Sequence, residues 1–177
     1  PVENLIGQEG KGWTYAKVLL THERTGIARV ANSKVRLAGL KKKASETSNG
    51  GPSLMDDAAF SQKVAELEID LQALEYTELR ALSSVATGKA PGPESSILKI
   101  KGSEIAQMID ELNVELAGYY CVPFVKEQFM DGFDGEPVGP DSACNTGPVY
   151  FNNRKASIYG GSNEVQRNII AKAVLGL

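Results

Sequence analysis

Apolar positions in this chain repeat at alternating spacings of three and four residues, which is the pattern of one face of an α-helix. The first stripe predicts a single long helix that begins at Trp13 and continues to about Lys43. Its members are Trp13, Ala16, Leu20, Glu23, Ile27, Val30, Lys34 and Leu37. Glu23 is the only acid in this stripe. The stem of Lys34 can lie along the apolar surface while its ammonium group reaches water.

A second stripe predicts another long helix, which ends at Gly88. Ser53 or Asp56 is expected to cap this helix, with Asp57 in its first turn, where negative charge suits the helix dipole. Its apolar face consists of Phe60, Val64, Leu67, Leu71, Leu74, Ala81 and Val85. The heptad-like spacing of this face is interrupted by Glu78.

A third stripe predicts a helix that begins at Glu94 or Ser95 and ends near Gly118. Its face consists of Leu98, Ile105, Met108, Ile109, Leu112 and Leu116. Residues 119–147 follow with many Gly and Pro and no clear period. A loop this long usually has a function or covers a surface. A short helix is expected around Tyr150–Ile158.

Residues 158–177 predict a glycine corner followed by a terminal helix. Gly160 and Gly161 allow backbone angles that a side chain disfavours, Ser162 or Asn163 can cap the helix, and Glu164 lies in its first turn. The expected apolar face is Val165, Ile169, Ile170, Ala173 and Val174. Free N–H groups at such a helix start can bind an anion or phosphate. A plain corner between two helices is the alternative, and a glycine-rich turn alone favours it.

These elements predict an all-α protein, an up-and-down four-helix bundle made of three long helices and a terminal one. No segment shows a convincing strand pattern, and there is no internal repeat. Residues 1–12 are rich in turn-forming residues and are expected to be an incoming linker, with the bundle over residues 13–177. The length of 177 residues fits one domain with a real core. A start at Pro1, without Met, is expected of a fragment or a processed product.

Composition and charge argue against several classes of protein. The net charge of −3 and the shortness of the basic run Lys41–Lys43 argue against a nucleic-acid-binding surface. The spacing of Cys121 and Cys144 fits neither a disulfide framework nor a metal site. Because His22 is the single histidine, no zinc site is expected. No signal peptide is visible, and no apolar run approaches the ~18 residues of a membrane span. We therefore expect a soluble cytoplasmic protein without a metal, nucleic-acid or membrane partner.

Both ends of the chain resemble the acyl-CoA dehydrogenase family, specifically its C-terminal helical domain. The matching pieces are residues 4–13 (NLIGQEGKGW), the Glu23-Arg24 pair, residues 159–167 (YGGSNEVQR) and residues 171–176 (AKAVLG). Residues 93–102 and 150–157 are similar to a bacterial branch that includes pimeloyl-CoA dehydrogenase large-subunit-like proteins. The resemblance covers the whole chain in order, with its more specific motifs at the two ends.

The resemblance implies that this chain is the last part of a longer enzyme. Family members have an N-terminal helical domain, a middle β-domain and a C-terminal four-helix bundle, so the isolated chain is expected to be inactive. The implied reaction is α,β-dehydrogenation of an acyl-CoA thioester. A glutamate removes an α-proton while a hydride passes from the β-carbon to N5 of FAD. Burial beside the acyl chain and the flavin raises the pKa of such a base toward its working range.

The position of the base is where this sequence departs from the commonest family pattern. In many members the glutamate directly follows the tyrosine of the terminal motif, and here that position is Gly160. Some branches carry the glutamate on the first bundle helix, before an arginine, and Glu23 before Arg24 matches that location. Glu23 is therefore the candidate base, with a core-edge carboxylate as the alternative. Arg24 either orients Glu23 or the acyl-CoA, or forms an ordinary salt bridge.

The resemblance also implies which ligands the C-terminal residues 159–164 contact. Gly161, Ser162 and Glu164 are implied to lie near the ADP part of FAD, whereas Tyr159 and Gly160 would contact the acyl-CoA. Tyr159 has plain helix packing as its alternative. The family segments that hold FAD across a subunit boundary are not matched by residues 38–43 (AGLKKK) and 115–120 (ELAGYY). FAD is then held mostly by a partner subunit, or weakly.

Two functions follow from the resemblance. The first is the base-carrying C-terminal domain of an FAD-dependent acyl-CoA dehydrogenase that passes electrons to electron-transfer flavoprotein or a similar acceptor. The alternative is a non-catalytic assembly subunit whose bundle completes the flavin site of a partner. Family bundles form the core of dimers and tetramers, so a homodimer, homotetramer or heterotetramer with exposed apolar helix faces is expected in both cases.

Overall fold

The computed structural model of the chain describes residues 1–23, 26–46, 51–88 and 92–177, and the side chains of residues 20–23 lie outside this description. The described residues form α-helices, short 3₁₀ turns and one π-helical turn, and no β-strand occurs among them. The helices are α1 (Gly12–Glu23), α2 (Val30–Ala44), α3 (Ala58–Ala86), α4 (Glu94–Ala117), α5 (Thr146–Asn153) and α6 (Asn163–Ile170). The π-helical turn Ala171–Leu175 continues α6. The all-α prediction is confirmed.

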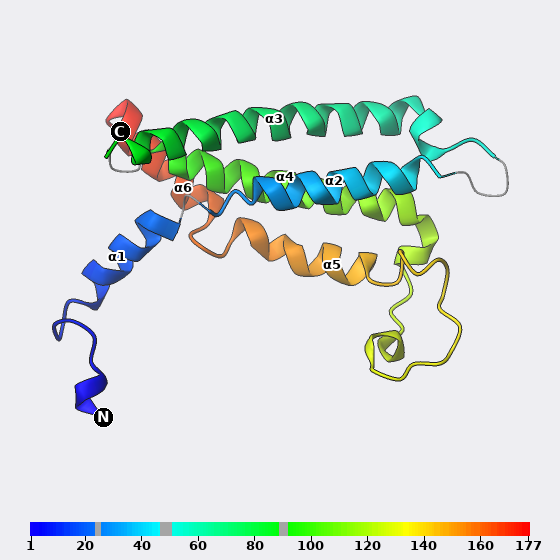
Figure 1. Cartoon of the computed structure of the whole chain (residues 1–177), viewed down its shortest axis with the longest axis horizontal. Helices are drawn as coiled ribbons and strands as arrows, with labels where there is room; N and C mark the ends of the chain where they lie inside the picture. Colours follow the sequence, from blue (N-terminus) through cyan, green and yellow to red (C-terminus); the bar gives the residue numbers. More distant parts are fainter. Residues whose placement is uncertain (24–25, 47–50, 89–91) are drawn as a thin grey trace.

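Helices α2, α3, α4 and α5 lie side by side and alternate in direction, so the bundle is of the up-and-down type (Figure 1). Helix α4 packs against α2, α3, α5 and α6. After the long helices, the short helices α5 and α6 follow each other in sequence, and each packs against α4. By contrast, α1 and the residues before it extend away from the bundle (Figure 1).

The core is built from the predicted stripes of α3 and α4. Phe60 and Leu67 of α3 and Ile105 and Ile109 of α4 are fully buried. From α2 the buried residues are Val30, Ser33, Leu37, Leu40 and Ala44. Lys34 is half exposed and reaches Glu75 of α3, as expected for a side chain with an apolar stem and a charged end.

The first predicted helix is two helices. Helix α1 ends at Glu23 and α2 begins at Val30, and Arg29 between them has left-handed backbone angles (φ 50°, ψ 37°). The cause is tertiary packing, because Ala28 lies directly on α4. A Cβ built on Gly102 would be 2.7 Å from the Cα of Ala28. A continuous helix would move this backbone off α4.

Two predicted boundaries were wrong in detail. Helix α3 is capped by Asp57, whose Oδ1 accepts a hydrogen bond from the backbone N–H of Phe60 at 2.8 Å. Ser53 and Asp56 instead close a capping box around the preceding 3₁₀ turn Leu54–Asp56. The short helix expected around Tyr150–Ile158 is α5, and the 3₁₀ turn Arg154–Ser157 follows it. Local cap signals were present, but several polar residues competed for each position.

Residues 118–145 form a lobe at one end of the bundle (Figure 1). The lobe contains only the 3₁₀ turns Gly118–Cys121 and Lys126–Phe129, in agreement with the predicted long loop. Of the helices in the described part of the chain, none combines the length and apolarity that crossing a membrane requires.

Candidate functional site at the corner between α5 and α6

The corner consists of two glycines whose backbone angles are left-handed. Gly160 has φ 68° and Gly161 has φ 86°. Residues with a Cβ seldom adopt such angles, so the predicted need for glycine is confirmed. A Cβ on Gly161 would also lie 2.6 Å from Nε2 of Gln166. The corner therefore exposes backbone where any other residue would place a side chain.

Ser162 caps α6, and Glu164 lies in its first turn. The backbone N–H of Val165 donates to Ser162 Oγ at 3.4 Å. The pKa of the Glu164 carboxyl is lowered, first by a hydrogen bond from its own backbone N–H and then by one from the Ser162 hydroxyl. The charges of Arg167 and Lys99 lower it further. An ionised carboxylate, a hydroxyl and open glycine backbone thus meet at one helix start.

The turn between α1 and α2 contacts this corner. A Cβ built on Gly160 would lie 3.2 Å from Cδ1 of Ile27. Glu23, the last residue of α1, is four residues before Ile27 in the sequence, although its side chain lies outside the described part. Arg24 lies outside the described residues altogether. Ile27 of this turn therefore lies beside Gly160, which is 133 positions further along the chain.

Tyr159 lines a cavity of about 90 Å³ next to the corner, and its side chain is half exposed. The other walls include Arg29 and Arg36 from the α2 side and Lys99 from α4. Asp110, buried on α4, forms an ion pair with Arg36 and accepts a hydrogen bond from Asn153 Nδ2 at 2.8 Å. The cavity therefore combines apolar walls, such as Ile27 and Ala106, with cationic side chains.

A buried polar cluster supports the corner from beneath. Lys99 Nζ donates to Asn163 Oδ1 at 2.7 Å and to the carbonyl oxygen of Ala156 at 3.2 Å. Ser103 Oγ lies 3.2 Å from the same Asn163 oxygen. Gln166 is completely buried, and neither polar atom of its side-chain amide has a hydrogen-bond partner among the described residues.

These residues correct the predicted face of the terminal helix. Val165 and Val174 are exposed, and α6 turns Asn163 and Gln166 toward α4 instead. The sequence did not predict that Lys99 supports the corner. The pattern that could have indicated it is a row of polar residues one turn apart on α4, beside the apolar stripe: Ser95, Lys99 and Ser103. Polar residues in such a row are commonly solvent-facing, and only the position of α6 buries them.

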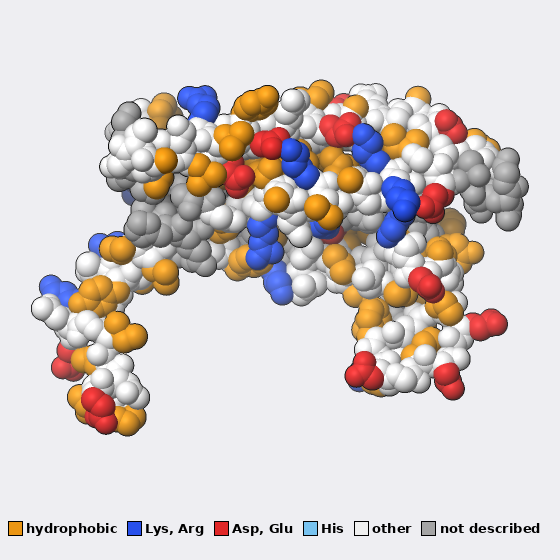
Figure 2. Space-filling view, viewed as in Figure 1, with side chains coloured by type: hydrophobic (Ala, Val, Ile, Leu, Met, Phe, Trp, Pro, Cys, Tyr) orange, Lys and Arg blue, Asp and Glu red, His pale blue; other side chains and the backbone are white. Residues whose placement is uncertain are grey.

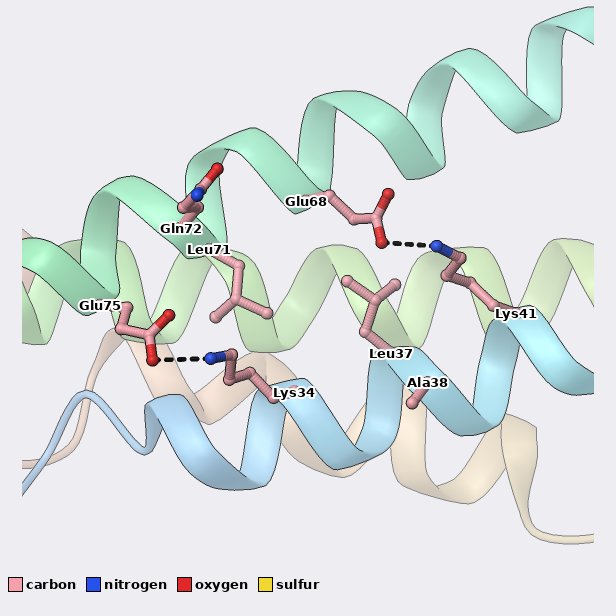
Figure 3. Close-up of a pocket in the computed structure, with 8 residues that line it drawn as sticks. All are labelled: Lys34, Leu37, Ala38, Lys41, Glu68, Leu71, Gln72 and Glu75. Atoms are coloured by element: carbon pink, nitrogen blue, oxygen red, sulfur yellow. Dashed lines mark hydrogen bonds and ion pairs between the residues drawn. The ribbon is translucent and has the colours of Figure 1, made fainter.

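A wider groove of about 640 Å³ lies between α2 and α3, away from the corner. Figure 3 shows its apolar floor, Leu37, Ala38 and Leu71, with the ion pairs Lys34–Glu75 and Lys41–Glu68 across it. None of the site residues predicted from the sequence lines this groove. In the described part of the chain, no group of three or more His, Cys, Asp or Glu side chains is arranged to hold a metal ion.

Comparison with known proteins decides the family. Residues 10–175 match the family described as acyl-CoA dehydrogenase, C-terminal domain. The chain belongs to the acyl-CoA dehydrogenase family. This match covers nearly the whole chain, including the end of α1 and the glycine corner, and confirms the resemblance seen in the motifs.

Three similar proteins illustrate how far the sequence and the fold of this chain are shared. The acyl-CoA dehydrogenase FadE26 of Mycobacterium tuberculosis is 29% identical over 184 residues, which cover 100% of this chain and 43% of FadE26. The caffeyl-CoA reductase-Etf complex subunit CarC of Acetobacterium woodii is 25% identical over 177 residues, 99% of this chain and 42% of CarC. The solved structure of PigA with FAD and proline has a TM-score of 0.74 at 18% identity, over 97% of this chain and 40% of PigA.

The PigA likeness shows a shared fold. The chain spans about two-fifths of the length of these relatives.

Proposed function

We propose that this chain is the C-terminal helical domain of an FAD-dependent acyl-CoA dehydrogenase, which carries out α,β-dehydrogenation of an acyl-CoA thioester. The observation that carries the proposal is the match of residues 10–175 to the family, together with a glycine corner at its terminal motif. The full activity belongs to a longer protein, because relatives such as FadE26 are more than twice as long as this chain.

Glu23 is the proposed base that removes the α-proton. Gly160 supplies no carboxylate at the usual position, so the base must come from another segment. The support for Glu23 is the contact between Ile27 and Gly160, because it brings the turn that follows α1 against the corner. Arg24, the next residue, is proposed to orient either Glu23 or the acyl-CoA. Tyr159 and Gly160 are proposed to contact the acyl-CoA beside them.

The corner fits a nucleotide cofactor, and FAD is the one proposed. The left-handed glycines leave space that a Cβ would fill, and among the hydrogen bonds of the described residues none is donated by the backbone N–H of Gly161 or Ser162. Such N–H groups at a helix start suit phosphate oxygens. The Glu164 carboxylate accepts hydrogen bonds only, so it suits a ribose hydroxyl. When bound, FAD supplies the hydride acceptor.

The proposal also assigns partners to the domain. Residues 1–12 would be the linker from a β-domain, and the isolated domain would be inactive without it. Electron-transfer flavoprotein is the proposed acceptor, in keeping with the Etf complex to which CarC belongs. Hydrophobic side chains are visible on the surface of the bundle (Figure 2). A homo- or hetero-oligomer accounts for the exposed apolar residues of α3, which include Ile69, Tyr76 and Leu79. We place the enzyme in the cytoplasm.

A second function fits the same fold. The domain would be an assembly subunit that completes the flavin site of a partner without removing a proton. The same exposed apolar residues of α3 fit this alternative as well as the first, because they offer a contact surface whether or not Glu23 is catalytic. The two functions differ in what they require of Glu23.

The substitution Glu23→Gln in the full-length protein tests the proposal. The amide cannot accept the α-proton, so we expect kcat to fall by about 10²–10⁴-fold or more, with the visible flavin spectrum retained. Steady-state turnover and an absorption spectrum measure the two effects.

The matched control is Glu9→Gln, which makes the same change at an exposed position and should leave both unchanged. If Glu23→Gln turns over at the wild-type rate, Glu23 is not the base and the assembly function is favoured.

A further inference from the structure

The ammonium group of Lys99 is buried, since only 2% of the residue is exposed. It donates to two acceptors, the carbonyl oxygen of Ala156 and Oδ1 of Asn163. Ala156 precedes Gly160 and Asn163 follows Gly161, so one side chain from α4 connects both flanks of the corner. Ser103, one turn further along α4, holds Asn163 as well.

Both acceptors of Lys99 are neutral, which is unusual for a buried charge. Burial lowers the pKa of Lys99, and the Glu164 carboxylate opposes this change. The same interaction lowers the pKa of Glu164, so the charge of Lys99 reaches the first turn of α6. A charge that served packing alone would be better replaced by an apolar side chain of similar volume.

We propose that Lys99 is a positioning residue, which holds the Gly160–Gly161 corner in shape and adds positive charge beneath it for a pyrophosphate-containing ligand. Two of its three N–H groups are used on the flanks of the corner, so loss of the side chain releases both flanks together. The identity of the ligand as FAD rests on the function proposed above, whereas the role of Lys99 in the shape of the corner does not.

A second observation points to a ligand at this corner. The side-chain amide of Gln166 is fully buried and lacks a partner among the described residues. Its Nε2 is directed at Gly161, since it lies 2.6 Å from the place of a Cβ on that residue. A buried amide without partners is destabilising unless another group satisfies it. Two buried polar side chains therefore lie next to the corner, Lys99 bound to Asn163 and Gln166 beside Gly161.

The test compares Lys99→Met with Lys101→Met in the full-length protein. Lys101 is on the same helix but exposed, where it pairs with Asp70 and Glu104. We expect Lys99→Met to weaken FAD binding by about tenfold or more, measured by titration of the apoprotein. We also expect faster amide hydrogen exchange confined to residues 156–166, with α3 unchanged. Lys101→Met should change neither.

Asn163→Ala provides the same test if Lys99→Met does not fold, because it removes one acceptor and keeps the charge. It should speed exchange at the corner and weaken FAD binding less than Lys99→Met does. Wild-type exchange at the corner with unchanged FAD affinity in Lys99→Met overturns the inference. Exchange that rises equally in α3 also overturns it, because that is a general loss of stability. A wild-type protein that binds no FAD contradicts the proposed function instead, and the exchange measurement still tests Lys99.

Discussion

At the scale of single residues, a side chain at each of the two corner glycines would meet a different neighbour. Both have left-handed backbone angles, which the sequence pattern Tyr-Gly-Gly-Ser already indicated. At Gly160 a Cβ would approach a methyl group of Ile27, and at Gly161 it would strike the buried amide of Gln166. The need for glycine was predictable from local sequence. The neighbours Ile27 and Gln166 were not predictable, because the turn after α1 and the packing of α6 on α4 place them beside the glycines.

Glu78 is another residue that the sequence singled out, as the interruption in the stripe of α3. It is partly buried, and burial, together with the neighbouring Glu75 carboxylate, raises its pKa. The folded protein therefore binds a proton at Glu78 more tightly than the unfolded chain, whose glutamates titrate near pH ~4.3. Stability is lost as pH rises through the window between the unfolded and folded pKa values, and the loss is complete above it.

We therefore expect Glu78→Gln to be more stable than the wild type at pH ~7, because the glutamine carries no charge to desolvate. The difference should shrink as pH falls below the folded pKa of Glu78, where the wild-type carboxyl is protonated too. Urea unfolding of both proteins across this pH range measures it.

Glu66→Gln is the control on the same helix. Glu66 is exposed, so its substitution should stay within about 0.5 kcal/mol of the wild type at every pH. An advantage of Glu78→Gln that is equally large at low pH would contradict the burial of a charged Glu78.

At the scale of elements, the three long stripes and their order were predictable, whereas the break between α1 and α2 was not. The stripe runs through Ile27 and Val30 at helical spacing, so the local pattern favours continuity. Packing decides otherwise, since Ala28 is fully buried with its backbone against Gly102 of α4. The α6 face was predicted wrongly for a related reason. Asn163 is buried opposite Lys99 and Ser103 of α4, and Gln166 is buried although its side-chain amide has no hydrogen-bond partner among the described residues.

The contact between the α1–α2 turn and α4 makes a direct prediction. Gly102→Ala places a Cβ 2.7 Å from Cα and 2.8 Å from the carbonyl oxygen of Ala28, and backbone atoms cannot rotate away as a flexible side chain can. We expect a loss of about 1–3 kcal/mol in the free energy of unfolding. Chemical denaturation measures this change.

Gly39→Ala is the matched control, because Gly39 lies within α2 with nothing within 4 Å of its Cβ position. The same substitution there should raise stability by about 0.5–1 kcal/mol, the usual gain of alanine over glycine in a helix. If Gly102→Ala is as stable as Gly39→Ala, the turn does not rest on α4 as described.

At the scale of the whole molecule, the chain has a complete core but leaves much apolar surface open. Trp13 on α1 is 71% exposed, and Tyr119 at the start of the lobe is 93% exposed. Large apolar side chains that stay exposed offer a contact surface for other domains or chains. The sequence showed the family and the bundle, because the motifs at both ends are local. It could not show which faces stay uncovered, since that depends on how the helices pack together.

We propose that this domain belongs to an FAD-dependent dehydrogenase of acyl-CoA thioesters. The most direct measurement is the visible absorption spectrum of the full-length protein, recorded without oxygen before and after addition of acyl-CoAs of different chain length. We expect the purified protein to show flavin bands that bleach with at least one acyl-CoA. A colourless protein that takes up no FAD, or flavin bands that no acyl-CoA bleaches, would contradict it.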